Sequence, residues 1–213
     1  MTTPQNSATT LLITTVDNAL RTLFAKPVAS RLYPLAADPG LGLSPREKAL
    51  SGALMRVNHT GEICAQALYS AQALTARNPA LRQEFNAARK EEGDHLAWTK
   101  QRLDALDSRP SLLNPLWYVA SFGLGLLAGT IGDKASLGFV VETERQVEAH
   151  LASHMQRLPV HDYQSKAIVG QMQKDEARHA LEAQAAGATE LPIVLKVTMR
   201  ATAKVMTTVA HWV

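Results

Sequence analysis

The sequence predicts an all-α protein whose central part is a four-helix bundle. Apolar residues recur at helical spacing through most of the 213 residues, and strict alternation of apolar and polar residues never persists for long. Prolines and glycines separate these periodic segments. A chain of this length is expected to form one domain. We divide residues 1–213 into an N-terminal extension (1–44), a bundle (45–190) and a C-terminal helix (191–213).

The first two helices are predicted from periodicity and from capping residues. Apolar residues at helical spacing over residues 11–24 indicate a short amphipathic helix, which is followed by a connector that contains several prolines. Ser44, Pro45 and Glu47 match a capping box with proline at the first helical position. A long helix is therefore expected over residues 45–77.

Further helices are expected along the rest of the chain. Asn78 can cap a helix over residues 79–107, and so short a turn makes this helix antiparallel to the preceding one. After a segment without charge, a second pair of helices is expected over residues 135–158 and 162–186. A last helical segment follows Pro192.

Composition and charge exclude several classes of protein. With 46% hydrophobic and 19% charged residues, the chain is neither disordered nor fibrous, nor a polytopic membrane protein. The single cysteine, Cys64, excludes a disulfide framework and any multi-cysteine zinc or iron–sulfur site, and it suits a reducing compartment. The net charge is +3 and lies in the C-terminal helix, so no nucleic-acid partner is expected. The first basic residue is Arg21, so no secretory or mitochondrial leader is expected.

Four glutamates and two histidines repeat one pattern twice. The pattern is a Glu followed by a Glu-x-x-His motif, 30 residues later in the first copy and 32 residues later in the second. The members are Glu62, Glu92 and His95 in the first copy and Glu144, Glu176 and His179 in the second. Residues three apart share one face of a helix, so the two side chains of each motif project together.

Hairpin geometry brings the earlier Glu of each copy level with its motif. At about 1.5 Å per residue, the two arms from residue 78 to Glu62 and to Glu92 measure roughly 24 and 21 Å. Each hairpin therefore offers two carboxylates and one imidazole at one height. Two facing hairpins gather four carboxylates and two imidazoles.

Such a cluster predicts a metal site. Burying four carboxylates without counter-charges is prohibitively unfavourable, so the core requires cations, and two divalent ions balance the four negative charges. Carboxylates and imidazoles without a thiolate suit iron or manganese. This is the ligand pattern of ferritin-like di-iron bundles, which we predict here. The alternative is that these residues are exposed charges on solvated helix faces.

Several other acidic residues and histidines lie near the predicted ligands in the sequence and are candidates for alternative ligands or for hydrogen-bond partners of the ligands. Glu148 shares the helical face of Glu144 and is an alternative ligand or a hydrogen-bond partner of one, whereas Glu142 points elsewhere. His150 and His154 form an i, i+4 pair without a matching acidic partner, which favours ordinary polar positions.

Three further residues lie close to Glu62 in the sequence. His59 and Tyr69 face the same interior as Glu62 and can hydrogen-bond the ligands, although a packed tyrosine is the commoner case. Cys64 is turned away from this face, and we expect it to be a small buried hydrophobe.

Residues 110–132 carry no charge and lie where a ferritin-like bundle needs its long crossover. Prolines and glycines make this segment a poor transmembrane helix, and one crossing would put the two halves of the metal site on opposite sides of a membrane. A membrane-facing helix with Trp117 and Tyr118 as interface anchors is one interpretation. A buried core helix is the other.

The C-terminal segment also has two interpretations. Lys196, Arg200 and Lys204 are spaced four apart beside apolar residues, which is typical of a basic amphipathic helix on anionic lipid. Packing against the bundle or against a second subunit fits the pattern equally well.

Five blocks of the sequence resemble the bacterial demethoxyubiquinone hydroxylases of ubiquinone biosynthesis. The resemblance extends from about residue 54 to the C-terminus, and the blocks are LMRVNHTGEICAQALYSAQALTAR, EEGDHLAW, SRPSLLNPLWY, SLGFVVETERQVEAHL and DEARH. In that family the metal positions correspond to Glu62, Glu92, His95, Glu144, Glu176 and His179. The resemblance thus favours Glu144 over Glu142, and a recurring family histidine matches His150.

The resemblance implies a peripheral membrane monooxygenase on the cytoplasmic side of a bacterial cell membrane. It implies two irons per chain, dioxygen as co-substrate, and NADH or another reductant as electron source. The implied substrate is a lipid-soluble polyprenyl methoxy-methyl-benzoquinol, and the expected protein partners are further copies of the chain or other ubiquinone-biosynthesis proteins. Two alternatives stay open at this point: a ferritin-like iron-storage protein and a non-enzymatic helical protein of the membrane surface.

Overall fold

The computed structural model describes residues 8–37 and 42–213, and within them it contains helices but no strand, as the sequence predicts. The helices follow the predicted order, and their ends lie within a few residues of the predicted ones. They are α1 (Ala8–Phe24), α2 (Pro45–Thr75), α3 (Pro79–Ala105), α4 (Asn114–Ile131), α5 (Asp133–Arg157), α6 (Tyr163–Ala185) and α7 (Ile193–Trp212).

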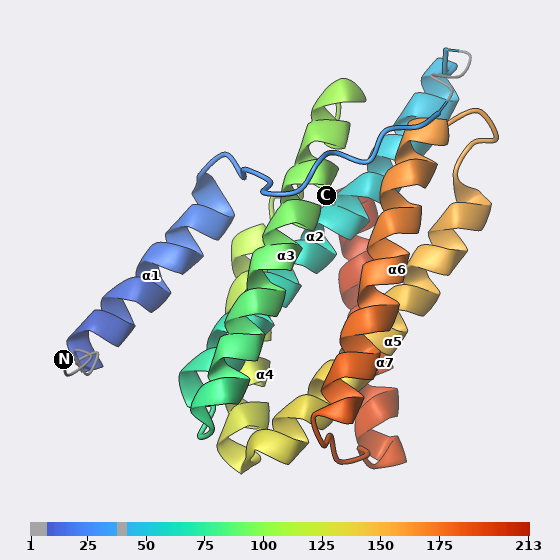
Figure 1. The fold of residues 1–213 in the computed structure, drawn as a ribbon. Helices are drawn as coiled ribbons and strands as arrows, with labels where there is room; N and C mark the ends of the chain where they lie inside the picture. The colour runs from blue at the N-terminus through green and yellow to red at the C-terminus, as the bar shows by residue number, and fades with distance from the viewer. Residues whose placement is uncertain (1–7, 38–41) are drawn as a thin grey trace.

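Helices α2, α3, α5 and α6 form the four-helix bundle as two antiparallel hairpins (Figure 1). The predicted capping residues start the first hairpin: the Glu47 amide donates to the Ser44 hydroxyl, and the Glu47 carboxylate accepts from the Ser44 amide at 2.9 Å. Asn78 Oδ1 accepts from the Ala80 amide at 2.9 Å and begins α3 after a very short turn. Local capping therefore fixes where each arm of the hairpin begins.

The two hairpins are aligned by hydrogen bonds at opposite ends of the bundle. At one end, both carboxylate oxygens of Asp133, the first residue of α5, accept from the amides of Arg77 and Asn78 at 3.0 Å. At the other end, Arg102 of α3 donates to Asp162, which also caps α6. These contacts hold both hairpins at one level along the bundle axis.

The bundle interior has two apolar parts that enclose a polar middle. One part gathers large side chains near the end where α6 begins, among them Leu54, Trp98, Leu151, Ile168 and Met172. The other lies near the α2–α3 turn and includes Tyr69, Phe85, Leu137 and Val141. The levels between them carry buried glutamates and histidines. Apolar packing on both sides keeps bulk water away from these charged groups.

Helix α4 is the predicted crossover, and it lies against α2 with its other side exposed. Gly125 lets the two backbones approach, while Leu116, Val119 and Leu127 stay more than half exposed. The interpretation of a buried core helix is therefore wrong. Tyr118 is also not an interface anchor as expected, because it is buried against α2 and α3. No helix in the described ranges combines the length and apolar character needed to traverse a bilayer.

Helix α7 returns along α2 and α5 and exposes most of its surface. Arg56 of α2 donates to the His211 carbonyl at 3.0 Å, and Gln146 of α5 donates to the Lys196 carbonyl at 3.3 Å. Two of the predicted basic residues have acidic neighbours: Lys196 pairs with Glu190 at 2.9 Å, and Arg200 lies 3.6 Å from Glu142. The C-terminal helix thus packs on the bundle, and its basic row is partly neutralised.

Helix α1 and the connector after it lie on the outside of the bundle. Helix α1 contacts α2 and α4, and in Figure 1 residues 25–37 then cross the faces of α3 and α6. Ala19 and Leu23 are the residues through which α1 packs against the bundle. The connector lies directly outside the polar middle of the bundle.

The close approach of α4 and α2 predicts a stability effect. A Cβ at Gly125 would lie 2.8 Å from Ala71 Cβ and 2.9 Å from the Leu68 carbonyl oxygen, so Gly125→Ala should lower the free energy of unfolding by about 1–3 kcal/mol. The matched control is Gly123→Ala in the same helix, where nothing lies within 4 Å. This control should be neutral or stabilising by up to about 1 kcal/mol. Urea unfolding compares the two, and equal effects would contradict the tight α2–α4 contact.

Candidate metal centre

All six predicted ligands are buried in the polar middle of the bundle. They come from the four bundle helices, and each is at most 3% exposed. Their positions are Glu62 on α2, Glu92 and His95 on α3, Glu144 on α5, and Glu176 and His179 on α6. The alternative of exposed charges on solvated helix faces is therefore wrong.

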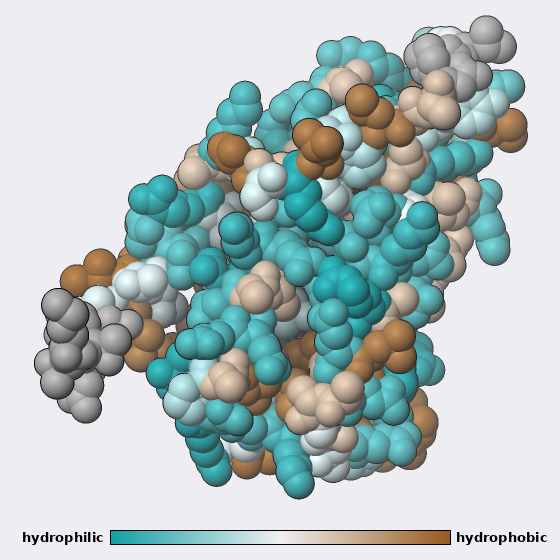
Figure 2. Space-filling view, in the orientation of Figure 1, coloured by the Kyte–Doolittle hydropathy of each residue, from teal (hydrophilic) through white to brown (hydrophobic). Residues whose placement is uncertain are grey.

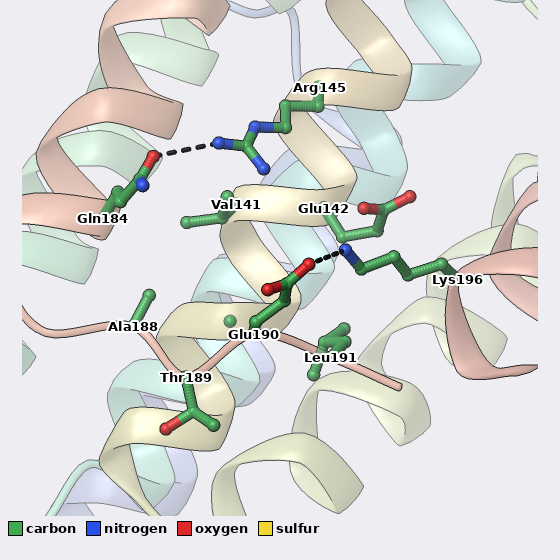
Figure 3. A pocket seen from close by; sticks show the side chains of 10 residues that line it. Val141, Glu142, Arg145, Gln184, Ala188, Thr189, Glu190, Leu191 and Lys196 are labelled. Carbon is green, nitrogen blue, oxygen red and sulfur yellow. Dashed lines mark hydrogen bonds and ion pairs between the residues drawn. The ribbon is translucent and has the colours of Figure 1, made fainter. Parts of the chain in front are cut away.

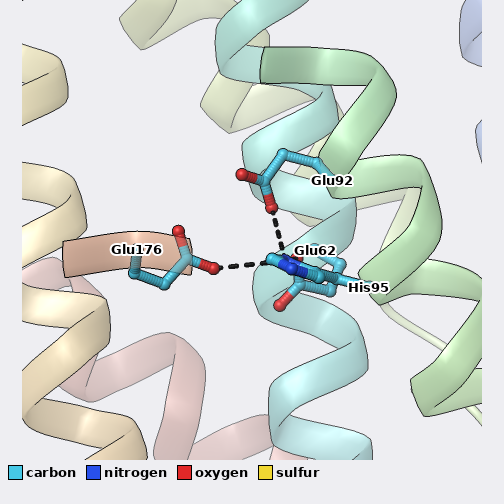
Figure 4. Close-up of side chains that lie close together, drawn as sticks. All are labelled: Glu62, Glu92, His95 and Glu176. Atoms are coloured by element: carbon cyan, nitrogen blue, oxygen red, sulfur yellow. Dashed lines mark hydrogen bonds and ion pairs between the residues drawn. The ribbon is translucent and has the colours of Figure 1, made fainter. Parts of the chain in front are cut away.

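The ligand atoms fall into two overlapping groups, in each of which they lie within 4.8 Å of one another. The first group is Glu62, Glu92, His95 and Glu176, which converge in Figure 4, and the second is Glu92, Glu144, Glu176 and His179. Glu92 and Glu176 belong to both groups. Each group also contains one further carboxylate and one imidazole. The arrangement has the form of two adjacent cation sites that share two carboxylates.

Both histidines turn the same ring nitrogen into the cluster. His95 Nδ1 lies 3.2 Å from Glu92 and 3.3 Å from Glu176, and His179 Nδ1 lies 3.1 Å from Glu92 and 3.5 Å from Glu176. A metal ion bound between these groups would be contacted by Nδ1 of each ring. The Nε2 atoms point away from the cluster and are free to donate elsewhere.

The outward nitrogens meet two carboxylates that the sequence interpretation missed. His95 Nε2 lies 2.9 Å from Asp175, and His179 Nε2 lies 3.4 Å from Glu91. Each of these residues directly precedes a glutamate shared by the two groups, and each contacts the histidine of the opposite hairpin. The available signal was the acidic residue before each Glu-x-x-His motif. The Asp175 contact is a hydrogen bond of the kind that fixes the tautomer and orientation of a ligating imidazole, whereas His179 Nε2 makes no hydrogen bond and approaches Glu91 only at ion-pair distance.

Glu144, and not Glu142 or Glu148, lies at the cluster. The Tyr69 hydroxyl donates to Glu144 Oε1 at 2.5 Å, which fulfils the expectation that Tyr69 hydrogen-bonds a ligand. Glu148 is half-buried and belongs to neither ligand group. Glu142 instead accepts from Gln146 at 2.6 Å and lines a polar pocket on the other side of α5.

That pocket lies between α5, the end of α6 and the connector to α7 (Figure 3). Its charged groups largely satisfy one another, since Arg145 donates to Gln184 and Lys196 donates to Glu190, both at 2.9 Å. None of the six cluster residues lines it. The pocket is therefore separate from the metal centre.

The remaining histidines and the cysteine lie outside the cluster. The rings of His150 and His154 contact each other with centroids 3.9 Å apart and planes tilted by 57°, and burial lowers the pKa of His150 to about 4. His59 is buried, and desolvation lowers its pKa to about 4, but it belongs to neither ligand group. Cys64 is half-buried rather than fully buried, and burial raises the pKa of its thiol to about 11.

The electrostatics of the cluster show unbalanced negative charge. Burial, together with the neighbouring carboxylates, raises the pKa of Glu62 and Glu144 well above the usual value. Burial works to lower the pKa of His179, but the Glu176 and Glu92 carboxylates overcome it and raise that pKa to about 11. Without a metal, the cluster therefore retains protons to offset its carboxylates.

The donor atoms of the cluster fit a metal. Three buried carboxylate oxygens, Glu62 Oε2, Glu92 Oε1 and Glu176 Oε2, have no hydrogen-bond donor within the described residues. Buried oxygens of this kind require a cation or a proton. Oxygen and imidazole donors without sulfur suit iron or manganese.

Comparison with known proteins identifies relatives over nearly the whole chain. Residues 49–210 match the family described as ubiquinone biosynthesis protein COQ7. The chain is 68% identical over 196 residues to 3-demethoxyubiquinol 3-hydroxylase of a Polaromonas species, covering 92% of this chain and 94% of that protein. It is 64% identical over 205 residues to the protein of that name in Polaromonas naphthalenivorans, covering 96% and 98%. For the Variovorax paradoxus protein of that name, the identity is 60% over 200 residues, covering 94% and 96%.

The charge balance of the cluster predicts opposite effects of one substitution. Glu144→Gln removes a buried negative charge but retains an oxygen for Tyr69. Because the folded-state pKa of Glu144 is raised above 4.5, its ionisation destabilises the metal-free fold progressively as pH rises beyond that value. At pH 8 the free energy of unfolding of the metal-free variant, measured by urea unfolding, should therefore be higher by about 1 kcal/mol or more. The variant should also bind divalent metal more weakly.

Glu142→Gln is the matched control, because Glu142 lies on the same helix outside the cluster. It should change neither the urea midpoint of the metal-free protein nor its metal affinity. Weaker metal binding in Glu142→Gln but not in Glu144→Gln would show that the ligand is misassigned.

Proposed function

The chain belongs to the family of the ubiquinone biosynthesis protein COQ7, and we propose that its buried cluster is a di-iron centre at which the ring of 3-demethoxyubiquinol is hydroxylated. The observation that carries this proposal is the sharing of Glu92 and Glu176 between two ligand groups. Two adjacent metals bridged by carboxylates suit chemistry that needs two electrons at one place. The proposed substrate is the one named in the relatives called 3-demethoxyubiquinol 3-hydroxylase.

Each ligand has a role in this proposal. Glu92 and Glu176 would contribute to both iron sites, Glu62 and His95 would complete the ligands of one, and Glu144 and His179 would complete those of the other. Bound iron would supply the capacity to bind and activate dioxygen. One oxygen atom enters the ring as a hydroxyl group and the other leaves as water, so the reaction also consumes two protons and two electrons, the electrons coming from NADH or another reductant.

The surrounding residues hold the ligands and exclude water. The hydrogen bond from Tyr69 restrains Glu144, and the hydrogen bond to Asp175 directs Nδ1 of His95 into the cluster. The apolar parts of the bundle on either side of the cluster keep the site dry, which strengthens electrostatic interactions inside it. Both features favour a defined ligand geometry.

A membrane-bound quinol can approach from the side of α4. This helix lies against the part of α2 that carries Glu62, and Thr60 of α2 donates to Asn114 of α4 at 3.0 Å. Its outer side is an exposed apolar surface. We propose that this surface attaches the protein peripherally to the cytoplasmic face of the cell membrane. The face in Figure 2 is mostly hydrophilic, with hydrophobic residues scattered over it and near α1.

The di-iron proposal predicts both metal content and activity. Anaerobic titration of the metal-free chain with ferrous iron should reach about two irons per chain. Glu176→Ala removes a shared ligand, so ring hydroxylation should fall by more than the roughly 10–100-fold that loss of an outer partner of a metal ligand costs. Measured with demethoxyubiquinol, dioxygen and a reductant, undiminished hydroxylation by this variant would refute the proposal.

Glu84→Ala on α3 is the control, because Glu84 is exposed and lies outside both ligand groups. It should retain full iron binding and activity. Size-exclusion chromatography separates the storage alternative, because an iron-storage protein should elute as a large shell.

The α4 surface predicts a membrane effect. Leu127 is 64% exposed, so Leu127→Glu should reduce co-flotation with anionic phospholipid vesicles while leaving iron binding intact. Leu181→Glu is the matched control, since Leu181 is 67% exposed on α6, away from α4. Equal loss of flotation in both variants would exclude α4 as the membrane-facing surface.

A further inference from the structure

The segment of residues 25–37, here called the strap, reaches the metal centre from outside the bundle. It crosses α3 and α6, as Figure 1 shows, and two residues in its middle form hydrogen bonds with these helices. The Ser30 amide and hydroxyl donate to Asp94 of α3, and Gln164 of α6 donates to the Pro34 carbonyl at 2.6 Å. Ala29 and Tyr33 pack against the apolar core. Residues 31–33, which lie between Ser30 and Pro34, are therefore held in a defined place.

Arg31 is one of these residues, and its guanidinium connects the two hairpins. Nε donates to Asp94 Oδ2 at 2.9 Å, and Nη1 donates to Asp175 Oδ2, also at 2.9 Å. Its carbon Cζ lies 4.7 Å from the Trp98 ring centre, which adds a cation–π contact. Asp94 lies on α3 and Asp175 on α6, so Arg31 connects the helices that carry the two Glu-x-x-His motifs. A planar guanidinium suits such a double contact, whereas a lysine amine does not.

The contact extends to a predicted metal ligand. Asp175 Oδ2 lies 2.9 Å from His95 Nε2, and Arg31 Nη2 lies 3.1 Å from the same nitrogen. Arginine only donates, so Arg31 Nη2 can hydrogen-bond Nε2 only when that nitrogen carries no proton. A metal at Nδ1 instead requires the proton on Nε2, and of these two neighbours only Asp175 can accept it. This tautomer leaves the Nδ1 lone pair directed into the cluster.

We propose that Arg31 is a positioning residue of the metal centre, which holds Asp175 and thereby fixes the orientation of His95. This inference rests on the metal centre proposed above. Arg31 lies outside the residues of the four bundle helices, so the strap is part of the site. The corresponding contact in the other half lies within the bundle, where Arg178 donates to Glu91, the partner of His179.

The two halves give a test that does not depend on activity. Metal-free full-length chain is titrated anaerobically with cobalt(II) against a competing chelator, and the d–d absorption follows each site. The titration has two cobalt-binding steps, one for each ligand group. Glu62→Gln should weaken only the step of the His95 site and Glu144→Gln only that of the His179 site, because each glutamate belongs to one group only, and this assigns the steps. Arg31→Met should weaken the step of the His95 site by about 10-fold or more and the other step clearly less, because Arg31 Nη1 lies only 3.9 Å from Glu91 and forms no hydrogen bond with it. Arg178→Met should weaken the step of the His179 site more than that of the His95 site, and the His95 step is also affected because Arg178 Nη2 lies 3.6 Å from Asp175 Oδ1.

Two variants separate position from charge and from general damage. Arg31→Lys keeps the charge but cannot bridge both carboxylates, so the His95 step should stay weaker than in the native chain. Arg21→Met removes an exposed arginine of α1 that pairs only with Asp17 among the described residues, and both steps should be native. Circular dichroism confirms that each variant is folded.

The outcomes distinguish this inference from the proposed function. If the native chain binds two cobalt ions and Arg31→Met binds both with native or higher affinity, the role of Arg31 is refuted and the metal centre stands. Equal weakening of both steps, or native affinity in Arg31→Lys, also refutes positioning by the guanidinium. If the native chain binds no cobalt, both proposals fail.

Discussion

Mutual repulsion among four buried carboxylates is the constraint on which the rest of this structure depends. Glu62, Glu92, Glu144 and Glu176 occupy one level of the bundle, in surroundings that raise the pKa of two of them. Such a group is stable only with protons or cations among its oxygens. The apolar parts of the bundle on either side supply the folding free energy that keeps the carboxylates together, and bound metal would supply the missing positive charge.

The second requirement is that the two halves of the site meet at one height. Neither hairpin alone has enough ligands for two metals. Asp133 holds the α2–α3 turn at one end of the bundle, and the Arg102–Asp162 pair ties α3 to α6 at the other. Arg31 adds a third connection at the level of the ligands. The alignment of the hairpins, and thus the metal geometry, depends on polar contacts between segments distant in the sequence.

The crossover helix relates this buried chemistry to an apolar substrate. Helix α4 packs on α2 through small residues and exposes its larger apolar side chains, which form the surface proposed above to face lipid. A quinol with a polyprenyl tail is soluble only in such surroundings. The position of α4 beside the helix that carries Glu62 places the apolar surface and the reactive centre one helix apart.

The sequence by itself determined the all-α class, the helix ends and the six candidate ligands. Capping at Ser44 and Asn78 is local, and the repeated Glu and Glu-x-x-His spacing follows from helical periodicity, so both are legible without a fold. Only the tertiary structure decided that Tyr118 is buried, that α4 is half-exposed and that Glu190 neutralises Lys196. The contacts of Asp175 and Arg31 with His95 also came from the fold, because packing of elements distant along the chain leaves no periodic pattern in sequence.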